Sequence, residues 1–173
     1  MTEKKIILKK KPTATVVSQG IRNKPRKISI NLPEFNENKI IPRRKARIII
    51  MQILYSLNFY TGDDIINYIE DMLNLKWVEL KLRKKDIIFI NNISRKIISH
   101  LEDIDKLIIN NLKNWDMDRI NIITKSILRM SIFEIKFLNE TPREIVINES
   151  VEISKIFSDN EQYKFINALL DKI

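Results

Sequence analysis

Residues 120–135 read INIITKSILRMSIFEI, and this stretch decides the fold class. Its apolar residues recur every three or four positions, which is the period of an α-helix and not of a strand. Two apolar rows run along this helix, and a helix that is apolar nearly all round is typical of the centre of a bundle. The two rows are Ile120, Ile123, Ile127, Met130 and Phe133, and Leu128, Ile132 and Ile135.

Glycine and proline are scarce around this helix: beyond residue 42 they occur only as Gly62 and Pro142. Hairpins need more turn residues than this. The many isoleucines favour strands by propensity, but the helical spacing of the apolar residues outweighs that preference. We therefore expect an all-α bundle of about six to seven helices.

Start and stop signals divide the bundle into helices. The first should begin at Pro42, which suits a first helical turn, and end at Gly62. The second follows Asp63 and Asp64 and reaches about Trp77.

A long helical stretch from about residue 80 to residue 112 should bend near Glu102. Asp116 or Asp118 should cap the central helix. Two further helices complete the pattern: one starts with Thr141, Pro142 and Glu144 as a capping box, and the last starts at Glu161.

Charge is distributed unevenly. Residues 1–47 hold 14 basic and 3 acidic residues, a net charge of +11, whereas residues 48–173 have a net charge of −2. We expect residues 1–42 to be a disordered basic extension and residues 43–173 to be the folded domain.

The sequence lacks residues that several classes of function need. The chain has no cysteine, and His100 is its single histidine, so Cys- and His-based metal sites are not expected. With one glycine in the body, a phosphate-cradling loop is not expected either. We expect no enzyme, no cofactor, no membrane segment and a cytoplasmic location.

Four cations, Arg43, Arg44, Lys45 and Arg47, lie within five residues at the start of the first helix. At about 100° per residue, Arg43 and Arg47 share one face. Cations at a helix N-terminus oppose the helix dipole, and a bound polyanion would reverse that cost. The cluster is either a solvated basic patch or a nucleic-acid site.

The last helix carries Tyr163, Lys164 and Phe165. Aromatic rings next to a cation are a common way to hold single-stranded RNA. The alternative is that Phe165 belongs to the edge of the core.

Arg129 interrupts the central helix. Because a buried arginine needs a carboxylate partner, we expect Glu149 or Glu152 to pair with it.

Four stretches, in this order, resemble the NusB family of transcription antitermination factors. They are residues 43–47 with 52–56, residues 115–135, residues 147–155 and residues 164–172. The resemblance implies two packed helical subdomains. It also implies binding of boxA RNA in ribosomal-RNA leader transcripts together with the ribosomal protein NusE, within a larger assembly of antitermination factors and RNA polymerase.

The resemblance also assigns residues to sites. The implied RNA-binding residues are Arg43, Arg44, Lys45, Arg47, Tyr163 and Lys164, and the implied partner-binding residues are Tyr55, Glu161 and Phe165. Two positions depart from the family pattern: Ser158 replaces a glycine, and Thr124 replaces an acid of the partner interface. An alternative function is a helical protein–protein adaptor whose basic extension binds nucleic acid non-specifically.

Overall fold

The structure is a computed structural model, and it describes residues 42–60, 62–78, 82–112, 116–158 and 161–173. Seven α-helices and no strand occur within these ranges, so the all-α prediction is confirmed. The predicted basic extension lies outside the described residues, apart from Pro42 at its end. The helices are α1 (Pro42–Leu57), α2 (Ile65–Leu73), α3 (Lys84–Ser99), α4 (Leu101–Asn111), α5 (Ile122–Phe133), α6 (Arg143–Phe157) and α7 (Gln162–Leu170), with a 3₁₀ turn η2 (Met117–Arg119) and a π-helical turn η3 (Glu134–Leu138).

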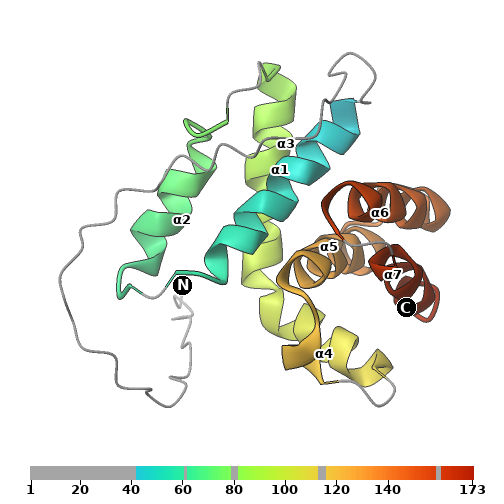
Figure 1. The fold of residues 1–173 in the computed structure, drawn as a ribbon. Coiled ribbons are helices and arrows are strands. Elements are labelled where there is room, and N and C mark those ends of the chain that lie inside the picture. Colours follow the sequence, from blue (N-terminus) through green and yellow to red (C-terminus); the bar gives the residue numbers. More distant parts are fainter. Residues whose placement is uncertain (1–41, 61, 79–81, 113–115, 159–160) are drawn as a thin grey trace, which may run out of the picture. The chain divides into compact units, whose positions relative to one another are not determined.

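The helices form two packed groups (Figure 1). In the first group α1 packs against α2 and α3; in the second, α5 packs against α4, α6 and α7. Helix α1 also packs against α5 and thereby joins the groups. Helix α5 is central, as its apolar rows predict.

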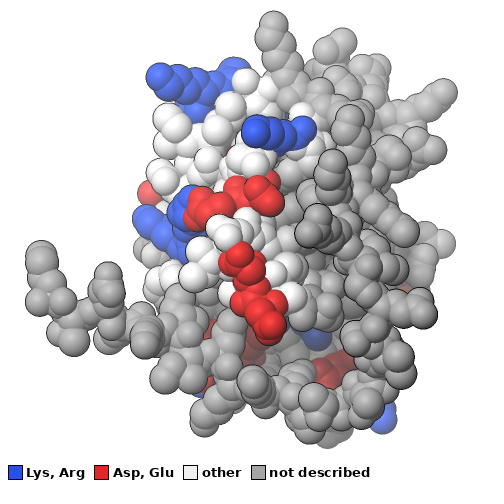
Figure 2. Space-filling view, turned by 90° about the vertical axis from the view of Figure 1, so that its left-hand side faces the viewer, with Lys and Arg blue, Asp and Glu red and all other residues white. Residues whose placement is uncertain are grey.

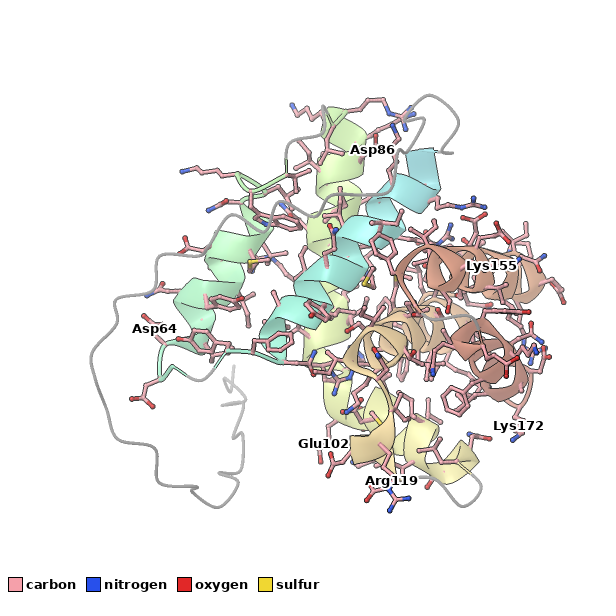
Figure 3. All side chains as sticks on the ribbon, viewed as in Figure 1. Asp64, Asp86, Glu102, Arg119, Lys155 and Lys172 are labelled. Carbon is pink, nitrogen blue, oxygen red and sulfur yellow. The ribbon has the colours of Figure 1, made fainter. Side chains whose placement is uncertain are left out.

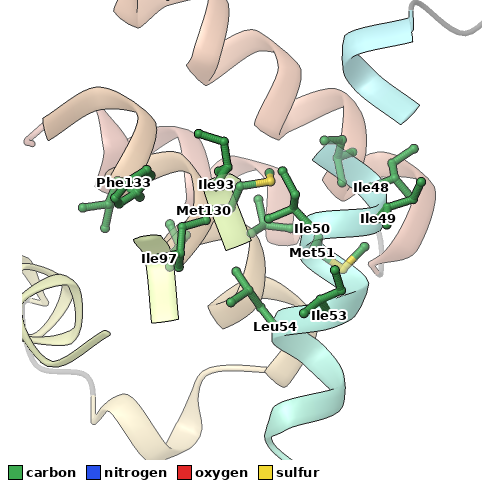
Figure 4. Packing of buried hydrophobic residues seen from close by; sticks show 14 of the residues in the cluster. Ile48, Ile49, Ile50, Met51, Ile53, Leu54, Ile93, Ile97, Met130 and Phe133 are labelled. Carbon is green, nitrogen blue, oxygen red and sulfur yellow. The ribbon is translucent and has the colours of Figure 1, made fainter. Parts of the chain in front are cut away.

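One hydrophobic core runs through both groups. Ile50 of α1, Ile93 of α3 and Met130 of α5 meet in it (Figure 4), and Ile50 and Met130 are completely buried. Where α5 meets α6, the hydroxyls of Ser131 and Ser150 lie 2.6 Å apart, so that one donates to the other, and each lies 2.7 Å from a carbonyl oxygen of its own helix. Small side chains therefore let the two helices approach closely.

Two helix starts show how local sequence sets the boundaries. Helix α2 begins directly after Asp64, as predicted, and Asp64 caps it because its carboxylate accepts a hydrogen bond from the backbone N–H of Asn67. The cap of α5 is Asn121 and not Asp116 or Asp118, so that prediction is wrong. Asp116 instead caps the preceding turn η2.

The predicted capping box at α6 is also wrong. The N-cap position is Pro142, the helix begins at Arg143, and no side-chain hydrogen bond caps this described segment. Because the helix starts one residue later than predicted, Thr141 lies outside the position from which a side chain caps the first turn.

Helix α1 ends at Leu57, before the predicted stop at Gly62. The side-chain amide of Asn58 donates to the carbonyls of Leu54 and Tyr55 and so satisfies the last turn. Helix α2 likewise ends at Leu73, short of the predicted Trp77.

The predicted bend in the long helical stretch is a full break at His100, close to the expected position. The His100 ring packs against Phe133 and Phe137, with centroid distances of 5.8 and 4.9 Å. The break therefore folds α4 back onto the end of α5. No helix within the described ranges is both long enough and apolar enough to span a membrane.

Candidate nucleic-acid interface

The first cation of α1 is exposed. Arg43 lies in the first turn, and its guanidinium carbon lies 4.0 Å from the centroid of the Phe89 ring on α3. This distance is within the range of a cation–π interaction. Phe89 therefore holds the charged end of Arg43 at the surface.

Arg44 points towards α6 and forms a bidentate ion pair with Glu149, with N–O distances of 2.7 and 2.8 Å. Their side chains are 21% and 13% exposed. The hydrogen bonds from Arg44 hold the pKa of Glu149 below its ordinary value, although burial opposes this shift. The same hydrogen bonds raise the pKa of Arg44, and the negative charge of Glu152 adds to the effect.

Arg47 is buried, with 4% of its surface exposed. It forms a bidentate pair with Glu134, the first residue of the π-helical turn, at 2.8 and 2.7 Å. Burial would lower the pKa of Arg47, but the carboxylate of Glu134 more than reverses this effect.

The four cations therefore do not form one exposed row. Arg43 and Arg47 are separated by one helical turn and meet different environments, because α1 packs against α5 at Arg47 but is open to solvent at Arg43. Lys45 is half-buried. In the part of the chain that the structure describes, the ion pairs at the start of α1 are those of Arg44 and Arg47.

The second candidate set lies on α7, beside α6. Tyr163 is half-buried, and Lys164 is exposed and pairs with Glu161 at 2.7 Å. The ammonium of Lys155 on α6 lies 5.6 Å from the Tyr163 ring centroid. Lys155 is a residue that the sequence did not single out as a site; its only signal was its place in a family-like stretch.

Helix α6 connects the two candidate sets. It packs against α1 on one side and against α7 on the other. Glu149 and Glu152 interact with Arg44, while Lys155, one turn beyond, lies against Tyr163 (Figure 3 labels Lys155). The start of α1 and the start of α7 thus border one surface.

The candidate partner-binding residues lie on two helices. Tyr55 is half-buried near the end of α1, and its ring lies 4.9 Å from that of Phe59, which is 57% exposed. Glu161 and Phe165 lie on or next to α7, where Glu161 is exposed and Phe165 is half-buried against the core.

Thr124, where the resemblance leads us to expect an acid, is completely buried. Its hydroxyl donates to the side-chain carbonyl oxygen of Gln162 at 3.1 Å and thereby ties α5 to α7. The threonine therefore contributes a contact inside the fold, and its effect on a partner interface stays a prediction.

The predicted partner of Arg129 is wrong. Its guanidinium binds Asp105 of α4 through two hydrogen bonds of 2.8 Å. The two expected carboxylates are engaged elsewhere: Glu149 binds Arg44, and Glu152 binds Lys155. The Arg129–Asp105 pair links α5 to α4, and its role in stability or at an interface stays a prediction.

The face that carries α2 is electrostatically different. Figure 2 shows acidic side chains in a line across it, with Lys and Arg side chains above and beside them. Asp63, Asp64, Glu70 and Asp71 are all exposed here, and Glu70 pairs with Arg95. Negative charge along this line of acids disfavours a phosphate backbone there.

The Arg44–Glu149 pair should make stability depend on pH. Because the pKa of Glu149 is lower in the folded chain than its ordinary 4.5, the pair stabilises the fold above that pH and this contribution is lost as the pH falls. Glu149→Gln should lower the free energy of unfolding by about 1–3 kcal/mol near neutral pH and by less at pH values below the ordinary pKa. Urea unfolding of the wild type and of Glu149→Gln, from neutral pH to below the ordinary pKa of glutamate, measures the difference in their free energies of unfolding.

The exposed Glu140 offers a matched control. Glu140→Gln removes the same charge outside the pair and should leave stability within about 0.5 kcal/mol of the wild type. A Glu149→Gln effect that stays constant down to acid pH would contradict the role of this carboxylate.

Comparisons with known proteins agree with this architecture. The NusB family model matches residues 44–173. The transcription antitermination protein NusB of Finegoldia magna is 37% identical over 131 residues, which cover 76% of this chain and 92% of that protein. The NusB protein of Treponema denticola is 34% identical over 135 residues, covering 77% and 96%.

Solved structures show the same fold. NusB of T. maritima aligns with a TM-score of 0.66 at 28% identity, covering 76% of this chain and 89% of that one. A chain from a crystal structure of the antitermination factors NusB and NusE in complex with double-stranded RNA aligns with a TM-score of 0.64 at 23% identity, covering 76% and 94%. With the family model matched over residues 44–173 and relatives above 30% identity over nearly their whole length, this chain belongs to the NusB family of transcription antitermination proteins.

Proposed function

We propose that this chain acts in the cytoplasm as an antitermination factor that binds boxA-type RNA of ribosomal-RNA leader transcripts together with NusE. The observation that carries the proposal is the surface around α6, which packs against both α1 and α7 in a NusB-family fold and contacts Arg44 and Tyr163. A related NusB has been crystallised with NusE and RNA, which supports the same pairing of partners here.

Different cations have different roles in this proposal. Arg43, Lys45, Lys155 and Lys164 contact phosphates, and Tyr163 stacks on a base. Arg44 and Arg47 orient the start of α1 through their carboxylate partners, with Arg44 at the edge of the RNA surface.

The remaining assignments complete the proposal. Residues 43–173 form the RNA-binding domain, and the basic residues of the segment 1–42 add phosphate contacts that do not depend on sequence. Tyr55, Glu161 and Phe165 bind NusE. The RNA-bound pair then joins other antitermination factors on RNA polymerase.

Sequence preference is the decisive test. With NusE present, the chain should bind a boxA-like single-stranded RNA more tightly than a scrambled RNA of the same composition at equal salt. Fluorescence anisotropy titrations with labelled RNA, with and without NusE, measure this ratio. Equal affinity for the two RNAs in the presence of NusE would favour a non-specific adaptor and reject the proposal.

Salt dependence supplies a second readout in the same titrations. Four phosphate contacts to single-stranded RNA give a slope of log K against log salt of roughly −3, and contacts from residues 1–42 would make it steeper. Lys164→Gln should make the slope less steep by about 0.7. Lys172→Gln, another exposed lysine beyond the end of α7, is the matched control and should leave the slope unchanged.

A further inference from the structure

A pocket of about 510 Å³ lies between the start of α1 and the first turns of α3. Figure 3 shows Asp86 at this end of α3, near the start of α1. The pocket is separate from the α6–α7 surface and contains none of the residues of α7. Its lining includes Arg43, Arg83, Lys85, Phe89 and Asn92.

An aromatic–cation pair forms one wall. The Phe89 ring packs against the hydrophobic core, so its position is set by the fold. Arg43 lies over this ring at 4.0 Å. A ring with a guanidinium over it offers a partly apolar surface, and nucleobases stack on both of these groups in complexes with single-stranded RNA.

Among the described lining residues, the charges around this wall are mostly positive. Arg83 binds Asp86 through two hydrogen bonds of 2.6 and 3.0 Å, so the one acid among the described lining residues is neutralised. Lys85 is exposed at the rim. The pocket therefore attracts an anion while its wall favours a flat ring.

The exposed Asn92 adds a hydrogen-bonding group. Its amide has both donor and acceptor atoms, which can meet the edge of a base. A simple carboxylate ligand would use the cations but would have no flat ring to place against Phe89 and Arg43. The combination of ring, amide and cations fits a nucleotide better than a carboxylate.

We propose that this pocket binds one unpaired nucleotide of the RNA, with its base against the Arg43–Phe89 pair, its edge at Asn92 and its phosphate at Lys85. The inference rests on the proposed RNA-binding function and extends the bound RNA past the start of α1 to α3. Arg43 then belongs to both parts of the interface.

Phe89→Leu tests the wall. It removes the ring but keeps an apolar side chain against the core, and it should weaken binding of the boxA-like RNA by about 5- to 100-fold in the presence of NusE, as expected for the loss of one stacked base. Phe89→Tyr keeps the ring and should bind like the wild type. The control is Phe137→Leu, which removes another partly exposed ring on the η3 turn and should not change RNA affinity.

Two exposed residues test the rest of the pocket without touching the core. Lys85→Gln should weaken RNA binding and make the salt slope less steep by about 0.7. Asn92→Ala should weaken binding without changing the slope. If circular dichroism shows that Phe89→Leu does not fold, the double variant of Lys85 and Asn92 decides the question, since both side chains are exposed.

The outcomes separate this inference from the proposed function. If the wild type prefers boxA-like RNA to scrambled RNA but every pocket variant binds boxA-like RNA as tightly as the wild type, the pocket does not bind RNA. The proposed function would still stand. Loss of NusE binding with unchanged RNA affinity would also overturn the inference about the pocket, because the pocket would then serve a protein partner. UMP, a free nucleotide with the same chemistry, is a further probe: pocket-dependent binding of UMP without any effect of the variants on RNA affinity would contradict a role in RNA binding.

Discussion

Glu134→Gln should lower the free energy of unfolding by about 3–5 kcal/mol, because it leaves the guanidinium of Arg47 buried without a compensating charge. The two side chains are only 5% and 2% exposed, so water cannot replace the lost carboxylate. Urea denaturation followed by circular dichroism measures the change. The midpoint should fall while the slope stays that of the wild type.

Two further variants define the cause. Replacing both partners, as Arg47→Met with Glu134→Leu, should recover most of the loss, since apolar side chains of similar volume remove the cost of burying charges. Glu70→Gln breaks the exposed ion pair with Arg95 and should change stability little. A double variant that is as unstable as Glu134→Gln would show that the damage is not an unpaired charge.

The same double variant separates two roles of Arg47. The family resemblance assigns it to the RNA surface, whereas its burial indicates that it orients α1. If the double variant folds and binds boxA-like RNA as tightly as the wild type, Arg47 acts only through the fold. If the double variant folds but binds RNA more weakly than the wild type, Arg47 contacts the RNA directly.

Ile50→Ala should lower the free energy of unfolding by about 2–5 kcal/mol, the cost of an empty cavity in a close-packed core. Ile50 is completely buried on α1, the helix that belongs to both packed groups. Both groups should therefore lose stability together. Amide hydrogen exchange in α3 and α7 measures this, and the most protected amides of the two helices should accelerate by the same factor.

Ile66→Ala is the matched control, because Ile66 is 71% exposed on α2 and leaves no cavity when it is shortened. It should change stability by no more than about 0.5 kcal/mol. Faster exchange in α3 but not in α7 after Ile50→Ala would mean that the two groups unfold independently, in contradiction to the shared core.

The helices could be predicted from the sequence because their signals are local. Apolar spacing identifies α5 as central, and Asp64 marks the start of α2. Boundaries were harder to predict where two nearby residues compete for one role, as Asp116 and Asn121 do before α5. The positions of caps depend on backbone angles that the residue types alone do not determine.

The side-chain partners could not be predicted in the same way. Arg44 and Glu149 are 105 residues apart, and Arg47 and Glu134 are 87 apart. A helical period tells which residues share a face, but not which helix covers that face. The sequence therefore groups Arg47 with Arg43, whereas packing of α1 against α5 buries it.

The candidate interface depends on the same long-range packing. Tyr163 and Lys164 stand out in the sequence, but Lys155 gains significance only because α6 places it beside Tyr163. Phe89 likewise reads as one more apolar residue of α3 until α1 brings Arg43 over its ring. Residues that act through a neighbour on another helix have no signal in their own segment.

The ion pairs that hold Arg44 and Arg47 of α1 have a consequence for the entropy of binding. Arg44 and Arg47 are long side chains with many rotamers, and each is already held in one orientation by a bidentate partner before any ligand arrives. Ordering such a side chain during association costs about 0.5–1.5 kcal/mol. Because folding has already ordered these two side chains, an RNA that docks at this end of the helix does not have to order them, and more of the free energy of its contacts remains as affinity.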